Sequence, residues 1–250
     1  MKQATRFSVQ VGWKLLIIDL GLNPADVLIL AGLPADLFSQ QNATLSIDEY
    51  FSFWMGMEKA ATDFELPLHI GQAISVESFD PPIFASLCSA NLNIALQCIS
   101  QFKPLIGPMN LQVDISESHT QVSISCYGHS GEIPATLGAA EVVFFTALAR
   151  LGTRQPIQPL SVTVENLPGN LAQYQDYFGI ELQQGAQNKI VFSAQDARQP
   201  FLTENITMWQ FFEAGLKLRL SELAMNAPTE KRVKSALLEM LPSGQTASHE

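Results

Sequence analysis

The fold is decided by a stretch that runs from QVSISCY (residues 121–127) through TLGAAEVVFFTALAR (136–150) to PLSVTVENL (159–167). The first and third segments favour β-strands, because apolar residues alternate with polar ones in both. The middle segment repeats apolar side chains at helical spacing and predicts a helix. Strands that alternate with a helix predict one compact layer that combines a β-sheet with helices.

The neighbouring segments extend this pattern on both sides. LQVDISES (111–118) alternates in the same way as QVSISCY, and the polar residues between the two segments predict a β-hairpin. Downstream, residues 170–178 predict a short helix, and IELQQ (180–184) and NKIVFS (188–193) predict two more strands.

The sequence before this region predicts mainly helices. A first helix is expected over residues 8–20. Ser46 and Glu49 form a capping box, SIDE, ahead of a helix whose apolar face carries Trp54. On that face Trp54 is either part of the core or a ligand contact.

Together these regions predict a mixed α+β fold. A helical N-terminal part (residues 1–107) is expected to pack on the α/β region (108–202), which contains a mixed β-sheet. A linking helix follows within residues 203–226. The apolar face of this helix carries Trp209, Phe212, Leu216 and Leu220.

Composition and charge exclude several classes of function. The 250 residues carry a net charge of −10, which argues against nucleic-acid binding by this polypeptide itself, because phosphate contacts need a basic surface. Three cysteines without CxxC spacing predict neither a disulfide framework nor a zinc site. The N-terminus lacks the apolar core of a signal peptide, and VGWKLLIIDLGL (11–22) is too short to span a bilayer. We therefore expect a cytoplasmic protein without a membrane partner.

The sequence also lacks the short motifs that mark common catalytic and nucleotide-binding sites. GxxxxGK[ST], GxGxxG, GxSxG and HExxH are absent, and the four histidines are dispersed. We predict no catalytic residues, no metal ligands and no cofactor, which favours binding over catalysis. Groups that are distant in the sequence can still meet in space, so an α/β enzyme with a site assembled from distant residues stays open as an alternative.

Glu141 breaks the pattern of the helix at 136–150, because it falls inside the apolar stripe. A buried unpaired carboxylate costs several kcal/mol, so it needs a cation, a hydrogen-bond donor or a raised pKa. Either Glu141 reaches solvent at the edge of the stripe, or it is the polar anchor of an otherwise apolar ligand pocket. On the second hypothesis, the candidate ligand-binding residues are Glu141, His129, Tyr127 and Trp54.

The order of the segments resembles the N-terminal effector-binding region of AraC/XylS-type transcription regulators, in the subgroup with an arabinose-binding-like domain. The resemblance rests on GLNPADVLILAGLPADLF (21–38), SIDEYFSFW (46–54), ELPLHIGQAI (65–74), SANLNIALQCISQF (89–102), the segment 159–193 and ARQPFLTEN (197–205). Within 159–193, YQDYFGIEL followed by a polar turn and KIVFS is the most distinctive part.

The tail EKRVKSALLEMLPSGQTASHE (230–250) resembles the opening of the family's DNA-binding region, with its first helix and a PSGQ turn. In the family that region contains two helix-turn-helix units, and residues 227–250 are too few to include a recognition helix. We expect an incomplete DNA-binding domain here, so that DNA is contacted only through a C-terminal domain missing from this chain.

The resemblance implies that residues 1–226 bind a small-molecule effector, form a homodimer and transmit the presence of the effector to the helix-turn-helix domain. The helix within 203–226 is the candidate for the dimer or coupling element, and its alternative role is plain core packing. The resemblance carries over no individual residue of the effector site. A protein-interaction module without a small ligand is the remaining alternative.

Overall fold

The computed structural model describes residues 3–73, 81–131 and 133–225. The helices are α1 (Val11–Asp19), α2 (Pro24–Ala31), η1 (Leu37–Ser39), α3 (Ile47–Ala60), α4 (Leu66–Gln72), α5 (Pro81–Leu87), α6 (Leu92–Phe102), η3 (Lys103–Leu105), α7 (Ala135–Thr153), α8 (Leu171–Phe178), α9 (Ala194–Ala197) and α10 (Ile206–Met225). The strands are β1 (Arg6–Ser8), β2 (Thr44–Ser46), β3 (Met109–Ile115), β4 (His119–Cys126), β5 (Ser161–Val164), β6 (Leu182–Gln184) and β7 (Asn188–Ser193). The expected start of a DNA-binding domain at 227–250 lies outside the described residues.

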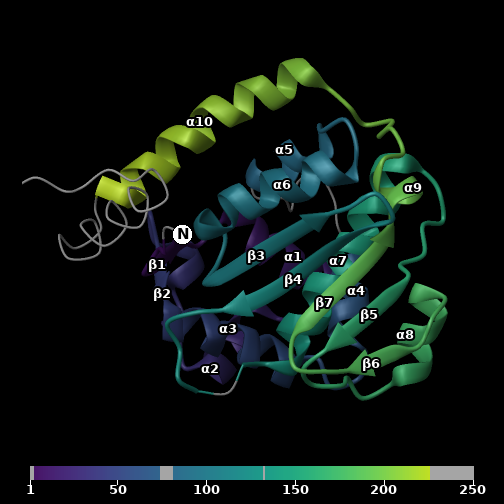
Figure 1. Cartoon of the computed structure of the whole chain (residues 1–250). Helices are drawn as coiled ribbons and strands as arrows, with labels where there is room; N and C mark the ends of the chain where they lie inside the picture. Colours follow the sequence, from purple (N-terminus) through teal and green to yellow (C-terminus); the bar gives the residue numbers. More distant parts are fainter. Residues whose placement is uncertain (1–2, 74–80, 132, 226–250) are drawn as a thin grey trace, which may run out of the picture.

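A five-stranded mixed sheet forms one layer of the molecule (Figure 1). Its strand order is β3-β4-β7-β5-β6, in which β5 and β6 pair in parallel and the other neighbours are antiparallel. The predicted hairpin is confirmed, with Val113 of β3 opposite Val122 of β4. The mixed α+β fold class predicted from the sequence is therefore correct.

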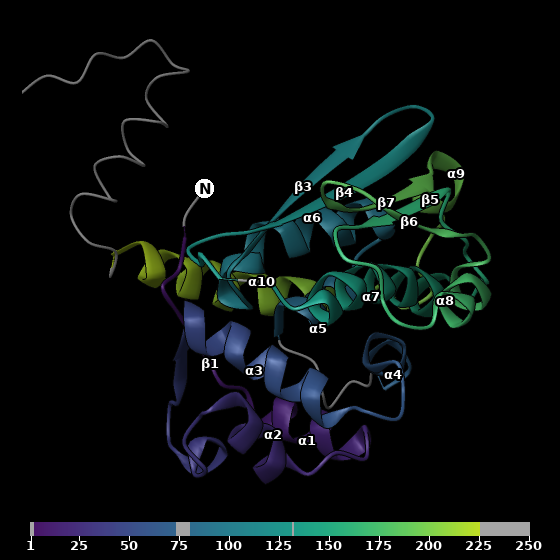
Figure 2. The same ribbon diagram turned by 90° about the horizontal axis from the view of Figure 1, so that it is seen from below.

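Helices cover the apolar face of this sheet. Val122 and Ile124 on β4 and Ile190 and Phe192 on β7 alternate with less buried residues, and each is at most 2% exposed. Helices α6 and α7 pack against the sheet on the side to which these residues point (Figure 2). The period-two alternation of the strands thus decides which side of the sheet receives the helices.

Helix α7 lies between the sheet and the N-terminal helices α1, α2 and α3 (Figure 2). By length and composition alone α7 could cross a membrane, since its mean hydropathy is 1.3, but 72% of it is buried within the protein. Such burial is typical of the central helix of a soluble core. The position of α7 between two layers explains why most of its residues are apolar.

Helix α3 begins with the capping box that the sequence predicts. The Glu49 backbone N–H donates to the Ser46 hydroxyl at 3.3 Å, and the Ser46 backbone N–H donates to the Glu49 carboxylate at 2.7 Å. These bonds fix the start of the helix, whose buried side then presents Tyr50 and Phe53 to the interior.

The first expected helix is partly wrong. Residues Arg6–Ser8 form β1, which pairs antiparallel with β2, and α1 begins only at Val11. The pairing places Phe7 opposite Leu45, and both are 1% exposed in the core. Burial against a distant partner decides the conformation here, and the local pattern does not reveal it.

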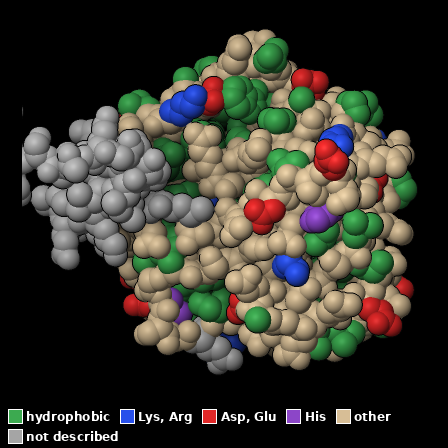
Figure 3. All heavy atoms as spheres, viewed as in Figure 1, with side chains coloured by type: hydrophobic (Ala, Val, Ile, Leu, Met, Phe, Trp, Pro, Cys, Tyr) green, Lys and Arg blue, Asp and Glu red, His purple; other side chains and the backbone are tan. Residues whose placement is uncertain are grey.

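Helix α10 crosses the edge of the molecule above α5 and α6 (Figure 1). Its Leu216 is 2% exposed and packs in a small cluster with Ala85, Cys98 and Phe102. The other side of α10 exposes Phe211 and Leu218 at 71% and 61%, and Ile206 in the first turn is 66% exposed. Figure 3 shows hydrophobic side chains along the upper edge of the molecule, where Figure 1 places α10.

Candidate functional site

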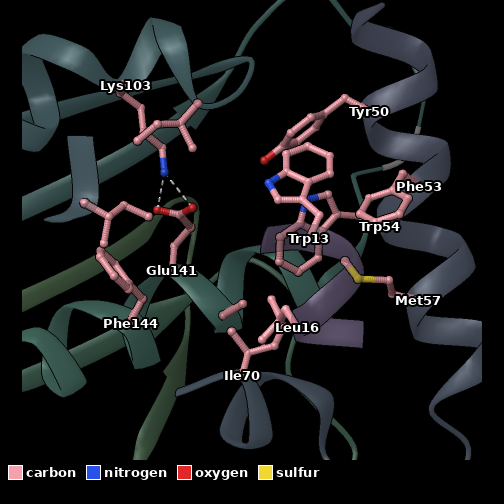
Figure 4. A pocket seen from close by; sticks show the side chains of 13 residues that line it. Trp13, Leu16, Tyr50, Phe53, Trp54, Met57, Ile70, Lys103, Glu141 and Phe144 are labelled. Atoms are coloured by element: carbon pink, nitrogen blue, oxygen red, sulfur yellow. Dashed lines mark hydrogen bonds and ion pairs between the residues drawn. The ribbon is translucent and has the colours of Figure 1, made fainter. Parts of the chain in front are cut away.

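A pocket of about 140 Å³ lies between the N-terminal helices and α7 (Figure 4). Helices α1 and α3 supply its aromatic wall, whereas α7 and η3 supply the opposite wall. Its lining consists of Trp13, Leu16, Tyr50, Phe53, Trp54, Met57, Ile70, Ile83, Lys103, Ile106, Ala140, Glu141 and Phe144. Apart from Lys103 and Glu141, these side chains are apolar or aromatic, which is the usual composition of a small-molecule site.

The polar feature of the pocket is an ion pair. The Lys103 ammonium donates to both oxygens of the Glu141 carboxylate, at 2.6 and 2.7 Å. The two side chains are only 4% and 12% exposed. Glu141 therefore has the buried cation that its place in the apolar stripe requires, and it does not reach solvent freely.

Sequence reasoning missed Lys103. It lies in η3, directly after α6, and is 3% exposed although lysine is rarely buried without a partner. The only local signal is a single cation in the otherwise apolar and proline-containing run FKPLIGP (102–108). Its partner follows 38 residues later, beyond the reach of any local pattern.

The aromatic wall is held in shape by its own contacts. The Trp13 ring stacks on Phe53 with centroids 5.1 Å apart and meets Tyr50 edge-on at 5.9 Å. A Cβ atom at Gly107 would come within 2.6 Å of the Tyr50 hydroxyl oxygen, so the chain after η3 needs a glycine at this close approach. The pocket is thus largely preformed by packing.

The four ligand-binding candidates from the sequence separate into two groups. Glu141 and Trp54 line the same pocket (Figure 4). His129 instead lies with Nδ1 2.6 Å from Asp48 Oδ1, which accepts the hydrogen bond, and its ring stacks on Phe51 with centroids 4.6 Å apart. Tyr127 is 8% exposed in the core, and burial raises the pKa of its phenol to about 12. The structure does not bring His129 or Tyr127 into the lining of this pocket.

The cysteine thiols are poor nucleophiles. Burial raises the pKa of the Cys98 thiol to about 11, and burial followed by the negative charge of Glu141 raises that of Cys126 to about 12. Burial also raises the pKa of Cys88. Within residues 3–73, 81–131 and 133–225, no group of three or more His, Cys, Asp or Glu side chains is placed to hold a metal ion.

The four residues chosen for a dimer or coupling role face the interior of the chain. Leu216 is in the small cluster with α5 and α6, and Phe212 and Leu220 pack against it. Trp209 lies beside the Cys98 thiol. These contacts suit a coupling element, whereas a dimer contact through α10 would need its opposite, exposed side.

Comparison with known proteins shows the family of the chain. The sequence matches the family described as the arabinose-binding domain of AraC transcription regulator, N-terminal, over residues 21–201. No curated protein sequence gives a significant match. Among solved structures, the transcriptional regulator CdpR from Pseudomonas aeruginosa has a similar fold, with a TM-score of 0.58 at 16% identity, over 96% of this chain and 73% of CdpR. At that identity the likeness concerns the fold alone, and the match over residues 21–201 shows that the chain belongs to the arabinose-binding domain family of AraC-type transcription regulators.

Proposed function

We propose that this chain is the effector-sensing and dimerisation region, residues 1–226, of a cytoplasmic bacterial transcription regulator. A small molecule binds in the pocket between α3 and α7, and Glu141, Lys103 and Trp54 contact it. The observation that carries the proposal is a preformed aromatic pocket with one buried ion pair, in a member of a regulatory-domain family. DNA contacts belong to a helix-turn-helix domain that follows residue 226.

Two elements of the pocket wall also contact α10, which supports a coupling role for that helix. Helix α5 supplies Ile83 to the pocket, while its Phe84 meets Phe212 of α10 with ring centroids 5.1 Å apart. Segment η3 supplies Lys103 to the pocket, while Leu105 packs beside the α10 residues around Leu216. A ligand that moves either element changes the support of α10, and therefore the position of any domain attached to it.

The exposed side of α10 supports the proposal of a homodimer. Phe211 and Leu218 are seven residues apart, so they lie on one side of the helix, and both are more than half exposed. Two copies of this apolar side could cover each other in a helix-to-helix contact.

The remaining alternatives are an enzyme and an interaction module without a ligand. The family and CdpR are transcription regulators. The raised pKa values of the thiols disfavour a cysteine nucleophile. A pocket with a buried ion pair disfavours a purely structural module, because a core without a ligand gains more from apolar packing.

A thermal-shift screen against acyl-lactones, fatty acids, amino acids, sugars and small aromatic compounds tests ligand binding. We expect at least one class to raise the Tm by several degrees, because a ligand that binds only the folded state stabilises it. Glu141→Gln and Glu141→Ala should abolish the shift, measured against the Tm of each variant alone. Asp114→Asn, which removes an exposed carboxylate from β3, is the charge-matched control and should keep it.

Hits that are unchanged in both Glu141 variants would show that the ligand binds elsewhere. Hydrogen exchange in residues 206–225 tests the coupling: ligand binding should change the protection of α10 in the wild-type chain, and an unchanged α10 would contradict the coupling role.

Analytical ultracentrifugation tests the dimer. Phe211→Glu and Leu218→Glu should shift the wild-type chain from dimer to monomer, while Lys217→Gln, which changes a neighbouring exposed residue, should not. A monomeric wild-type chain at high concentration would exclude a dimer through α10.

A further inference from the structure

We infer that the pocket between α3 and α7 takes an uncharged compound about the size of one aromatic ring, with a polar substituent that both donates and accepts a hydrogen bond. This inference rests on the proposed function and narrows the effector to a chemical class. Three properties of the pocket carry it: its size, its charge balance and its limited number of polar groups.

The size of the pocket limits the ligand to a compact body. Its volume is about 140 Å³. An apolar protein cavity of roughly 150 Å³ accommodates benzene, so a ring with a small substituent fits. A long acyl chain does not fit without rearrangement of α1 or α3. Trp13, Trp54 and Phe144 offer flat aromatic surfaces, which favour a planar ring over a branched aliphatic body.

The charge balance of the pocket favours an uncharged ligand. Lys103 and Glu141 bind each other at 2.6 and 2.7 Å and neutralise each other. In the described part of the pocket lining there is no other charged side chain. A carboxylate or ammonium on the ligand would therefore bring a third charge beside a pair whose side chains are only 4% and 12% exposed, at a cost of several kcal/mol.

The ion pair nevertheless offers hydrogen bonds to a neutral group. An ammonium has three N–H donors, of which two serve the carboxylate, and each carboxylate oxygen accepts more than one bond. The pair lies on one wall of the pocket and faces the aromatic wall across it (Figure 4). A hydroxyl or primary amide on the ring can donate to Glu141 and accept from Lys103 at once.

The same inventory disfavours a sugar. A pentose carries several hydroxyl groups, and each one left without a partner in an apolar pocket costs about 1–3 kcal/mol. Among the described lining residues, the charged side chains are the Lys103–Glu141 pair, and the other side chains are apolar or aromatic. We therefore expect this chain to differ in ligand from the sugar in the name of its family.

The test compares toluene, benzyl alcohol, benzoate, benzylammonium and L-arabinose, titrated at neutral pH by calorimetry and by tryptophan fluorescence. Two of the three tryptophans line the pocket, so occupancy should change the emission. Benzyl alcohol should bind at least about tenfold more tightly than either charged analogue and than toluene. In the double variant Lys103→Met/Glu141→Leu, benzyl alcohol and toluene should bind equally well, while Asp114→Asn should behave like the wild type.

The outcomes separate this inference from the proposed function. If benzoate, benzylammonium or L-arabinose binds as tightly as benzyl alcohol, the ligand class is wrong although the pocket remains a ligand site. If the double variant keeps the preference for the alcohol over toluene, the ion pair is not what recognises the polar group. If no compound binds to the folded wild-type chain, the ligand class is wrong, and the proposed function of this pocket is wrong as well if the thermal-shift screen also gives no hit.

Discussion

Two regions of this molecule hold an acidic side chain against a basic one at the same distance, in opposite surroundings. In the pocket wall, Lys103 meets Glu141 at 2.6 Å with side chains 4% and 12% exposed. At the start of α3, His129 meets Asp48 at 2.6 Å with side chains 14% and 79% exposed. The N···O distance is the same in both pairs, so the two pairs differ in the access of water to their side chains.

The difference concerns what happens when one partner is lost. Water can solvate Asp48 if His129 is removed, so that pair contributes little. Glu141 has almost no access to water, so the loss of Lys103 leaves a carboxylate without compensation inside an aromatic pocket. Removal of one partner of the pocket pair therefore strongly destabilises the fold. An ion pair is useful at this position only if it makes interactions that apolar residues cannot make.

The largest expected effect comes from breaking the pocket pair. Lys103→Met or Glu141→Leu alone should lower the free energy of unfolding by roughly 3 kcal/mol, because either change leaves one buried charge unpaired. The double variant should recover most of this loss, since two apolar side chains of similar size pack without desolvation cost. Urea unfolding of the four proteins measures the coupling.

Single variants that add up to the double variant would show that the two charges do not depend on each other. In that case the pocket is wetter than the exposed fractions of 4% and 12% indicate, and the contrast with the start of α3 disappears.

The sequence revealed most of the sheet and its covering helix because these elements repeat over many residues. The alternation in 121–127 recurs often enough to exclude a helix there. The helical spacing in 136–150 recurs often enough to exclude a strand. The strand β1 has three residues, of which only Phe7 is buried. A single buried residue has no period, so this strand could not be recognised without its partner β2.

The candidate site was predictable in part, for a similar reason. Glu141 is conspicuous because it violates a long apolar stripe, and the structure accounts for it with a cation. Lys103 violates no pattern, because η3 is too short to have one. His129 was chosen because it lies close in the sequence to the helix that carries Glu141. Proximity along a loop does not determine where a side chain points.

The second prediction concerns the capping box at the start of α3, and its effect should be intermediate. Ser46→Ala should lower stability by about 1 kcal/mol, because the Glu49 N–H loses its acceptor. The hydrogen bond from the Ser46 backbone N–H holds the pKa of Glu49 below its usual 4.5. A lowered pKa in the folded state adds stability above pH 4.5, which is lost as the pH falls through the lowered value.

Urea unfolding of the wild type and of Glu49→Gln measures this pH dependence. The difference in stability between them should be largest near neutral pH and should shrink as the pH falls to about 3. A difference that stays constant over this range would mean that the Glu49 charge does not contribute, and that the cap acts through Ser46 alone.

The smallest expected effect belongs to the exposed pair. Asp48→Asn should cost at most about 0.5 kcal/mol at low salt, because the carboxylate is 79% exposed and its attraction to His129 is screened by water. Added salt should remove most of the difference between this variant and the wild type. The His129 ring keeps its stacking contact with Phe51 at 4.6 Å in either case, so the loop before α7 stays in place. A loss of unfolding free energy as large as that of Lys103→Met, and unchanged by salt, would contradict the view that solvent exposure separates the two regions. Two pairs at 2.6 Å would then be equivalent despite their different access to water.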